Sequence, residues 1–502
     1  MPLRTRRLRH LPLCLALAAA GMPLAHAAPV EVAPGLREAA ARDGSVDTLV
    51  VLAAKAPKQL LRGEGDYRER RRALVDMLRA TAEVSQADLR AWLDAEGVAH
   101  RAFWIVNSIE ARLTPAQLEA LALRSDIAAL RTNTPVALAR PAEEGEGTPL
   151  PQPTSIEAIE WGVNKVRAPM LWAAGYTGQG VVVAGQDTGI RWTHAVLKNK
   201  YRGWNGTSAE HAYNWHDAVH GTGSAACAGD RPEPCDDNGH GTHTVGTMLG
   251  DDGGTNQVGV APGARWIGCR NMNAGAGTPA TYNECAQFFL APTDAAGQNP
   301  DPDRAPDVIN NSWGCPPDEG CTAGNEVREA IENLVEGGIV FVAAAGNDGS
   351  ACSTIFDPPA IYDASLTIGS MTSADAMSGF SSRGPVVGAV TVKPDVIAPG
   401  SSVRSATRSS DTAYGSMSGT SMATPHVAGV VALLMSVDPS LRGDPARVAA
   451  LLRETAIPLT STTQVCGGIA ATTFPNPVQG YGRVDAWNAF LLLDRIFADD
   501  FD

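Results

Sequence analysis

Four short apolar runs downstream of residue 180 constrain the fold of this chain more than any other feature. Each run is continuous rather than alternating in polarity, as is typical of strands covered on both faces in a parallel sheet. The runs lie at 181–185, 307–310, 338–345 and 365–369. Segments with helical periodicity lie at 325–336, 421–437 and 446–455. We therefore expect an α/β domain with a central parallel sheet flanked by helices.

The region before this domain predicts a small α+β module. It contains a strand at 46–53, a helix at 67–96, a strand at 101–113, a helix that begins at Thr114-Pro115 and a strand at 127–130. Threonine suits the N-cap of a helix, and proline fits the first helical position. Residues 139–153 lose all periodicity and are rich in proline and glycine, so they predict a linker.

The first residues predict an export signal rather than part of the fold. Four arginines between Arg4 and Arg9 precede an apolar run at 11–24, which Ala25-His26-Ala27 follows. This order is typical of a secretory signal that is cut after Ala27. The run is too short and too often interrupted by proline and glycine for a membrane anchor. We find no later stretch long and apolar enough to cross a bilayer, so we expect a secreted chain, extracellular or periplasmic, without membrane contact after signal cleavage.

These features divide the chain into five parts. They are a signal peptide at 1–27, the α+β module at 28–138, the linker at 139–153, the α/β domain at 154–493 and a short acidic tail at 494–502. The domain core is expected to be complete after residues 480–485. A formal net charge of −14 argues against a nucleic-acid partner, because nucleic-acid binding needs a basic surface.

The cysteines predict disulfides. Of the nine, Cys14 leaves with the signal, and an even number remains in an exported chain. Zinc is the competing interpretation, but the sequence contains no C-x-x-C motif. Short spacing favours the pairs Cys227–Cys235 and Cys315–Cys321, and the other four cysteines could pair in three ways.

Asp187 is the first candidate for chemistry, because it closes an apolar run at the position where α/β folds place ligands and catalysts. A buried strand can also end in an ordinary capping aspartate. The sequence Asp187-Thr188-Gly189 matches the aspartic-protease signature as well. That chemistry needs two carboxylates that share a proton. No second such motif exists in the chain, so this alternative would require a homodimer.

His240 and His243 form the second candidate, three residues apart in a glycine-rich segment. Their spacing invites a metal-binding interpretation. However, no glutamate follows at zincin spacing, and His426 is the only later histidine. A third ligand would have to come from upstream or from a carboxylate. Two structural histidines in a turn are the simpler alternative.

Ser421 is the third candidate, at the beginning of an apolar helix. Helix N-termini present backbone N–H groups and a positive dipole end, which suit a nucleophile that generates an oxyanion. An ordinary N-cap serine is the alternative role. The segment also approaches the nucleophile elbow of α/β-hydrolases, whose order is serine, acid, histidine. Here only His426 follows Ser421, five residues along the same helix, so that order fails.

With the order Asp187, His240, Ser421, the chain resembles the subtilisin-like serine proteases, and in several stretches their bacillopeptidase F-like branch. Eight segments in the family's order, spread over some 250 residues, carry this resemblance. They are QDTGI (186–190), NGHGTHTVGTM (238–248), VGVAPGA (258–264), DVINNSWG (307–314), AAAGNDG (343–349), FSSRGP (380–385), KPDVIAPG (393–400) and GTSMATPHVAG (419–429). The module at 28–138 likewise resembles the family's propeptide, an intramolecular chaperone and inhibitor.

The resemblance implies a role for each matching residue. Ser421 would be the nucleophile, His240 the general base and Asp187 the residue that orients the imidazole. Asn347 would donate its side-chain amide to the oxyanion, together with the backbone N–H of Ser421. His243 matches a second, non-catalytic histidine. Three consecutive residues, Ser312, Trp313 and Gly314, match the segment that pairs with the substrate backbone by strand addition.

The resemblance further implies a self-processing zymogen that acts on proteins or peptides and is inhibited by its own propeptide. The segment 136–140 could lie along residues 312–314, which would place the maturation cut between Pro135 and Pro153. No cofactor is required. Structural calcium, common in the family, is compatible with the acidic loop at 251–256, without named ligands. The competing interpretation is a pseudoprotease or binding protein on the same fold.

Specificity depends on where Asp357 lies. In the family, the segment after the oxyanion asparagine forms the floor of the main side-chain pocket. If Asp357 lies at that floor, its carboxylate would favour lysine or arginine in the substrate. If it points to solvent, the pocket should prefer large apolar residues.

Overall fold

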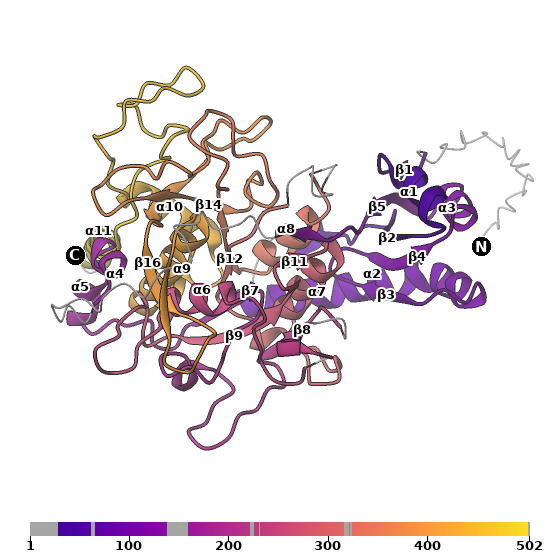
Figure 1. Ribbon diagram of the computed structural model, residues 1–502, viewed down its shortest axis with the longest axis horizontal. Coiled ribbons are helices and arrows are strands. Elements are labelled where there is room, and N and C mark those ends of the chain that lie inside the picture. The colour runs from indigo at the N-terminus through magenta and orange to yellow at the C-terminus, as the bar shows by residue number, and fades with distance from the viewer. Residues whose placement is uncertain are drawn as a thin grey trace, which may run out of the picture.

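Seven parallel strands form the sheet at the centre of the α/β domain (Figure 1), which confirms the predicted fold class. The computed structural model describes residues 29–61, 66–137, 159–220, 225–229, 231–315, 321 and 324–499. The predicted signal peptide and linker lie outside these residues. Across the sheet the strands are β15 (Val396–Pro399), β14 (Leu366–Met371), β13 (Val340–Ala344), β12 (Val308–Asn311), β7 (Val182–Asp187), β9 (Arg265–Arg270) and β8 (Trp215–Asp217).

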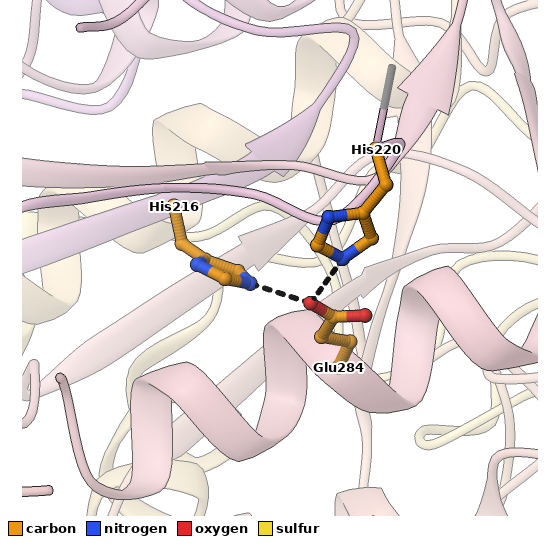
Figure 2. Close-up of side chains that lie close together, drawn as sticks. All are labelled: His216, His220 and Glu284. Atoms are coloured by element: carbon orange, nitrogen blue, oxygen red, sulfur yellow. Dashed lines mark hydrogen bonds and ion pairs between the residues drawn. The ribbon is translucent and has the colours of Figure 1, made fainter. Parts of the chain in front are cut away.

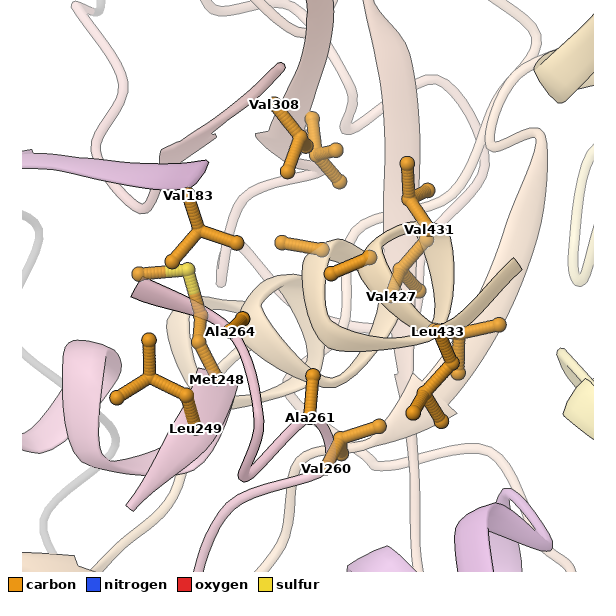
Figure 3. Close-up of a cluster of buried hydrophobic side chains, with 14 of the residues drawn as sticks. Val183, Met248, Leu249, Val260, Ala261, Ala264, Val308, Val427, Val431 and Leu433 are labelled. Carbon is orange, nitrogen blue, oxygen red and sulfur yellow. The ribbon is translucent and has the colours of Figure 1, made fainter. Parts of the chain in front are cut away.

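The central strands are buried on both faces, which explains their continuous apolar sequence. Val183 and Val308 face a cluster on one side, whereas Ala184 and Ile309 face a second cluster on the other side. The first cluster is built around α6 (His240–Leu249) and α9 (Thr420–Val437), which pack on each other (Figure 3). The two helices therefore hold their N-termini in fixed positions relative to the sheet.

Helix α9 corrects the expectation that no stretch after the signal is long and apolar enough to cross a bilayer. By length and composition it could span a bilayer, and it is the one such helix in the described part of the chain. However, 89% of the segment is buried inside the protein, as befits a core helix. Its hydrophobicity is thus accounted for by packing against α6 and the sheet.

Further helices cover the two faces of the sheet. They are α4 (Trp161–Lys165), α5 (Ala168–Ala173), α7 (Pro279–Leu290), α8 (Arg328–Glu336), α10 (Pro445–Thr455) and α11 (Ala486–Asp499). The expectation that the core is complete after residues 480–485 is wrong, because Ala486, Ala489 and Leu493 of α11 are buried in the first cluster. Helix α11 also continues into the predicted acidic tail. Short strand pairs add β10 (Met272–Asn273) with β11 (Ala276–Gly277), and β16 (Val403–Ala406) with β17 (Tyr414–Met417).

The N-terminal module carries a five-stranded sheet, with strand order β1-β5-β2-β4-β3, in contact with its three helices. Its elements are β1 (Glu31–Val32), α1 (Leu36–Asp43), β2 (Val46–Leu52), α2 (Tyr67–Ala95), β3 (His100–Phe103), β4 (Ser108–Leu113), α3 (Pro115–Ala122), β5 (Ile127–Thr132) and β6 (Val136–Ala137). Thr114 caps α3 as expected, in a reciprocal capping box with Gln117. The sequence did not indicate β1 or α1.

The single strand expected at 101–113 is in fact a hairpin, and its turn is apolar because the α/β domain covers it. Ile105 and Val106 of the turn are buried in the second cluster. The backbone N–H groups of Trp104 and Ile105 donate to Gln287 Oε1 of α7, and Asn333 Nδ2 of α8 donates to Ile105 O. Asn107, with φ 45°, is the polar residue that ends the turn, whereas the three residues before it give no turn signal in the sequence.

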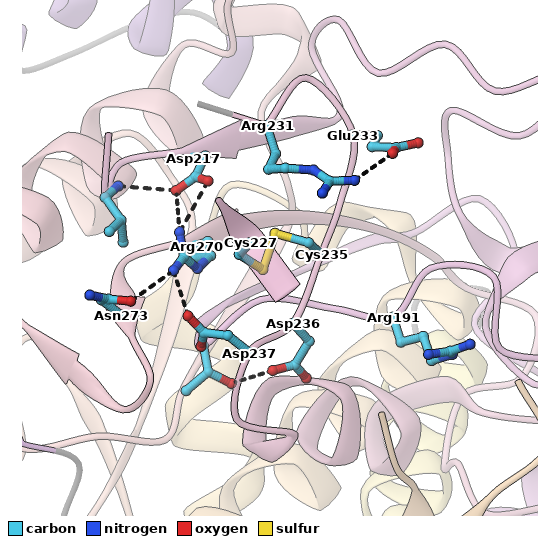
Figure 4. The surroundings of a disulfide bond; sticks show 12 residues. Arg191, Asp217, Cys227, Arg231, Glu233, Cys235, Asp236, Asp237, Arg270 and Asn273 are labelled. Carbon is cyan, nitrogen blue, oxygen red and sulfur yellow. Dashed lines mark hydrogen bonds and ion pairs between the residues drawn. A yellow bond between two sulfur atoms is a disulfide. The ribbon is translucent and has the colours of Figure 1, made fainter. Parts of the chain in front are cut away.

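Four disulfides occur among the described residues: Cys227–Cys235, Cys269–Cys285, Cys315–Cys321 and Cys352–Cys466. The first and third are the pairs that short spacing favoured. Next to the first lies the fully buried Arg270 of β9, which pairs with Asp217 at 3.1 Å and Asp237 at 2.5 Å (Figure 4). Arg270 thereby connects the sheet to the segment that leads into α6.

Candidate active site

The three predicted catalytic residues come from three elements that meet at the carboxyl edge of the sheet. Asp187 is the last residue of β7, His240 the first residue of α6 and Ser421 the second residue of α9. Strand β7 lies in the middle of the sheet, between β12 and β9. The packing of α6 on α9 places both helix N-termini at this edge.

Asp187 and His240 form a buried pair. Their side chains are 2% and 1% exposed, and His240 Nδ1 lies 2.9 and 2.8 Å from the two carboxylate oxygens of Asp187. The N–H of Thr188 donates to Asp187 Oδ1. This arrangement fixes the proton on Nδ1 and leaves Nε2 as the basic nitrogen. No described residue makes a hydrogen bond with His240 Nε2.

Asp236 holds the beginning of α6, a function that the sequence did not reveal. Its carboxylate accepts from the backbone N–H groups of Asn238, Gly239 and Thr242, and from Thr188 Oγ1. Complete burial raises the pKa of Asp236, against the lowering effect of these hydrogen bonds. A carboxylate at a helix N-terminus is favourable, since it satisfies unpaired N–H groups there. Asp236 is therefore a positioning residue for His240.

Ser421 makes reciprocal hydrogen bonds with Ser312 rather than a bond with His240. Ser421 Oγ donates to Ser312 O at 2.9 Å, and Ser312 Oγ donates to Ser421 O at 2.9 Å. The N-terminus of α9 is thus fastened to the segment that follows β12. Catalytic hydrogen bonds are often long or poorly aligned without substrate and tighten in the complex.

Asn347 follows β13 and faces the N-terminus of α9. Its Oδ1 accepts from Thr420 N at 2.9 Å and from Thr420 Oγ1 at 3.0 Å, which fixes the orientation of the amide. The side-chain nitrogen then lies beside Gly419, 3.5 Å from where a Cβ of that residue would be. Asn347 Nδ2 and the N-terminus of α9 consequently present donors on the same side of Ser421.

The predicted substrate-binding segment packs on α7 through Trp313. The Trp313 ring stacks on Tyr282 of α7 with 3.7 Å between ring centroids. Tyr282 in turn lies directly beneath Gly277 of β11, where any Cβ would meet its ring at 2.5 Å. Strand β6 of the N-terminal module pairs antiparallel with β11, through Val136↔Gly277 and Ala137↔Ala276.

This pairing refines the expected position of segment 136–140. Its first two residues pair with β11. The sequence did not reveal β11, which is only two residues long and contains no branched or aromatic side chain. Residues 138–140 lie outside the described part of the chain.

Asp357 lies against the predicted substrate-binding segment and not in solvent. It is 7% exposed, and a Cβ on Gly314 would be 3.3 Å from its Oδ2. The next residue, Pro358, accepts a hydrogen bond from Cys315 N. The two segments therefore run side by side, and the solvent-facing alternative for Asp357 is wrong.

His243 and His426 are buried structural residues. His243 Nε2 donates to Val403 O and Gly415 O, and burial lowers its pKa to about 3. His426 Nδ1 donates to Met422 O one turn earlier in α9, and burial lowers its pKa to about 4. Within the described ranges, neither His240 nor His243 belongs to a group of three or more metal-ligating side chains.

In the 251–256 loop, the carboxylate of Asp252 is engaged in hydrogen bonds within the loop itself. Asp252 accepts from the N–H groups of Gly254 and Asn256 and from Asn256 Nδ2. These hydrogen bonds lower the pKa of Asp252, although its partial burial opposes them. Within the described ranges, the loop belongs to no cluster of three or more metal-ligating side chains.

Comparison with known proteins agrees with this architecture. Residues 178–482 match the subtilase family. The chain is 34% identical to Bacillopeptidase F of Bacillus subtilis over 451 residues, which is 86% of this chain and 29% of that protein. It is 34% identical to Subtilisin DY of Bacillus licheniformis over 58% of this chain and 89% of that protein. The Major intracellular serine protease of Bacillus subtilis is 30% identical over 56% of this chain and 77% of that protein.

The alignment with Bacillopeptidase F covers most of this chain but only part of that protein. The chain spans less than a third of the length of Bacillopeptidase F. Residues 178–502 make up less than two thirds of the chain, so an alignment over 86% of it extends into the N-terminal module. The family match, the order of the motifs and the parallel sheet together lead to one conclusion. This chain belongs to the subtilase family of serine-type peptidases.

Proposed function

We propose that the chain is a secreted serine endopeptidase, made as a zymogen that processes itself. The observation that carries this proposal is the buried Asp187–His240 pair, held at 2.8 Å beside the N-terminus of α9 where Ser421 lies. The disulfides support export, because such bonds persist in oxidising compartments. Proteins or peptides are the substrates.

In the proposed reaction, Ser421 Oγ attacks the substrate carbonyl carbon as its proton moves to His240 Nε2. The carbonyl oxygen becomes an oxyanion. When the carbonyl re-forms, the C–N bond breaks and His240 gives its proton to the leaving nitrogen. A water molecule, deprotonated by His240, then attacks the acyl-enzyme. The C–O bond to Ser421 breaks, and His240 returns the proton to Ser421 Oγ. Asp187 stabilises the imidazolium in both steps.

Because Ser421 Oγ donates to Ser312 O, substrate binding is expected to change the orientation of the Ser421 hydroxyl. A substrate N–H that pairs with Ser312 O takes the acceptor that Ser421 Oγ uses in this structure. Rotation about the Cα–Cβ bond of Ser421 then brings its hydroxyl toward His240 Nε2, which has no other described partner. The substrate itself thereby helps to assemble the nucleophile and its base.

Replacing Asn347 by leucine is expected to lower kcat by about 10²–10³, with little change in KM, a magnitude known from subtilisin itself. The reason is that Asn347 Nδ2 would donate to the oxyanion, which exists only in the transition state. Steady-state kinetics on a peptide substrate measure the effect. Asn325→Leu, at an exposed asparagine, serves as the control. A kcat within threefold of the parent for Asn347→Leu would exclude this role.

The N-terminal module is proposed to be the inhibitor of its own peptidase domain. Its last strand, β6, pairs with β11, next to the stacked rings of Trp313 and Tyr282. An extended substrate would pair with β11 at the same place. Because Val136 and Ala137 lie within this strand, we expect the maturation cut after Ala137 and before Pro153. Held there, the linker meets Ser421 at a high effective concentration, so the first cut is intramolecular.

Asp357 is expected to make the peptidase prefer arginine or lysine on the acyl side of the cut. Its carboxylate lies beside Gly314 of the substrate-binding segment. Asp357→Asn should reduce cleavage after arginine roughly 30-fold or more, since losing one partner of a buried charge pair costs at least about 2 kcal/mol. A mixed peptide library measures the preference, with Asp363→Asn at an exposed loop contact as the control. Preference of the parent for phenylalanine or leucine over arginine would overturn this assignment.

A fluorophosphonate probe tests the proposed function directly. The mature protein should take up one probe per chain, on a peptide that contains Ser421, because the reagent labels serines activated by a base. Absence of labelling after removal of the N-terminal module would instead favour a binding protein on the same fold.

A further inference from the structure

Two histidines and a glutamate outside the active site converge on one point at the side of the sheet (Figure 2). His216 belongs to β8, His220 follows it after three residues, and Glu284 lies on α7. The Nε2 atoms of His216 and His220 each lie 2.7 Å from Glu284 Oε1. Within the described ranges this is the one group of three or more such side chains whose ligand atoms all lie within 4.8 Å of one another.

We propose that His216, His220 and Glu284 form a binding site for a divalent transition-metal ion of the zinc type. Two imidazole nitrogens and one carboxylate oxygen suit such ions better than calcium or magnesium, which prefer oxygen ligands alone. Three protein ligands also leave a fourth position for water. All three residues belong to the α/β domain, so the site remains after the N-terminal module has left.

The two nitrogen–oxygen distances require only a small expansion to admit the ion. Metal–ligand bonds of about 2.0–2.1 Å in a tetrahedron separate the ligand atoms by about 3.3 Å. The two nitrogen–oxygen distances of 2.7 Å would therefore widen by roughly half an ångström. Rotation of the His220 ring, which is 34% exposed, can supply this change. The ring of His216 is held by stacking on Phe288, with 5.3 Å between ring centroids.

The surroundings of the Glu284 carboxylate suit a cation. The Glu284 carboxylate faces the Nε2 atoms of His216 and His220 at Oε1. The Arg101 guanidinium donates to its other oxygen, Oε2, at 2.8 Å. The ion would replace the two N–H donors that now face Glu284 Oε1.

An ion can reach the cluster through the cavities on either side of it. One cavity, of about 620 Å³, lies between the N-terminal module and α7 and is lined by Arg79, Trp104 and Phe288, among others. The other, of about 320 Å³, lies toward Trp215, Arg231 and Asp294. All three ligands line both cavities. The site is thus accessible without unfolding.

The N-terminal module supplies a competing cation. Arg101 of β3 donates to Glu284 Oε2 at 2.8 Å and to Glu110 Oε2 at 2.6 Å. Its guanidinium group lies close enough to repel an ion bound at Oε1. Metal affinity and attachment of the module are therefore coupled, and by linkage each weakens the other. The metal site itself does not depend on the proposed peptidase activity.

The test uses the full-length chain with Ser421→Ala, free of any affinity tag, titrated with Zn²⁺ by calorimetry and with Co²⁺ by visible absorption. We expect one ion per chain, with Co²⁺ bands typical of nitrogen and oxygen ligands. Glu284→Gln and His216→Gln should each weaken binding more than about 100-fold, which exceeds the cost of losing a residue that only orients a ligand. Arg101→Gln should tighten binding about fivefold or more.

A control variant, His211→Gln, and a measurement of the unfolding temperature complete the test. His211→Gln should leave the affinity unchanged, because His211 pairs with Tyr201 and lies outside the cluster. Zn²⁺ should raise the unfolding temperature of the parent but not of Glu284→Gln. No stoichiometric binding, or equal losses for His211→Gln and His216→Gln, would overturn the site. Unchanged affinity in Arg101→Gln would overturn the coupling to the module.

Discussion

Ser421→Ala is expected to leave the precursor uncut at the length that begins near Ala28, whereas the parent chain loses roughly 110 residues. The alanine variant lacks the oxygen that would form the acyl-enzyme, and in subtilisin itself loss of this serine costs about 10⁶ in kcat. Folding and export should persist, because the small alanine side chain fits the same helix position. Electrophoresis and mass spectrometry of the secreted protein measure the outcome.

A second serine of the same helix provides the control. Ser436 lies near the end of α9 and hydrogen-bonds Leu433 O, far along the helix from the proposed nucleophile. Ser436→Ala should be processed like the parent. If Ser421→Ala is trimmed at the same bond in a host that lacks other proteases, Ser421 does not make the cut.

Asp187→Asn should slow self-cleavage by about 10⁴, as the same change does in other Asp-His-Ser triads. The asparagine amide can donate to His240 Nδ1, which then loses its proton to Nε2 and leaves that nitrogen unable to act as a base. A self-cleavage that takes one minute in the refolded parent precursor would take roughly a week in the variant.

The time course of refolded precursor on gels measures this rate. Asp252→Asn, in the 251–256 loop, changes a carboxylate with comparable backbone contacts and should cleave at the parent rate. A loss below tenfold for Asp187→Asn would mean that His240 acts without Asp187.

The sequence predicted those parts of the fold whose pattern follows from local burial. The runs that became β7, β12, β13 and β14 are apolar throughout because helices cover both faces of the sheet, and this is visible without any partner. The beginning of helix α3 was likewise predicted, from Thr114 as its N-cap and Pro115 as its first residue. The residues of the proposed triad were found by their motifs, since each stands at the end of a strand or the beginning of a helix.

Features that depend on distant partners were not predictable in this way. Strand β11 consists of Ala276 and Gly277 and becomes a strand only by pairing with β10 and β6. The apolar residues 104–106 of the hairpin turn depend on α7 and α8 for their burial. His216 and Glu284 are 68 residues apart and meet because β8 and α7 lie side by side. The hydrogen bonds between Ser421 and Ser312, 109 residues apart, have the same origin.

The Cys352–Cys466 bond closes a segment with a sequence separation of 114 residues, and this gives the protein a tolerance to internal nicking. Inside that segment the loop with Val387 and Val390 is almost fully exposed, at 98% and 89%, so it offers an obvious place for cleavage by another molecule of the same kind. A cut there would separate Asn347 from Ser421 in the chain. The disulfide would still join the two fragments covalently, and their shared core would keep both halves of the site together.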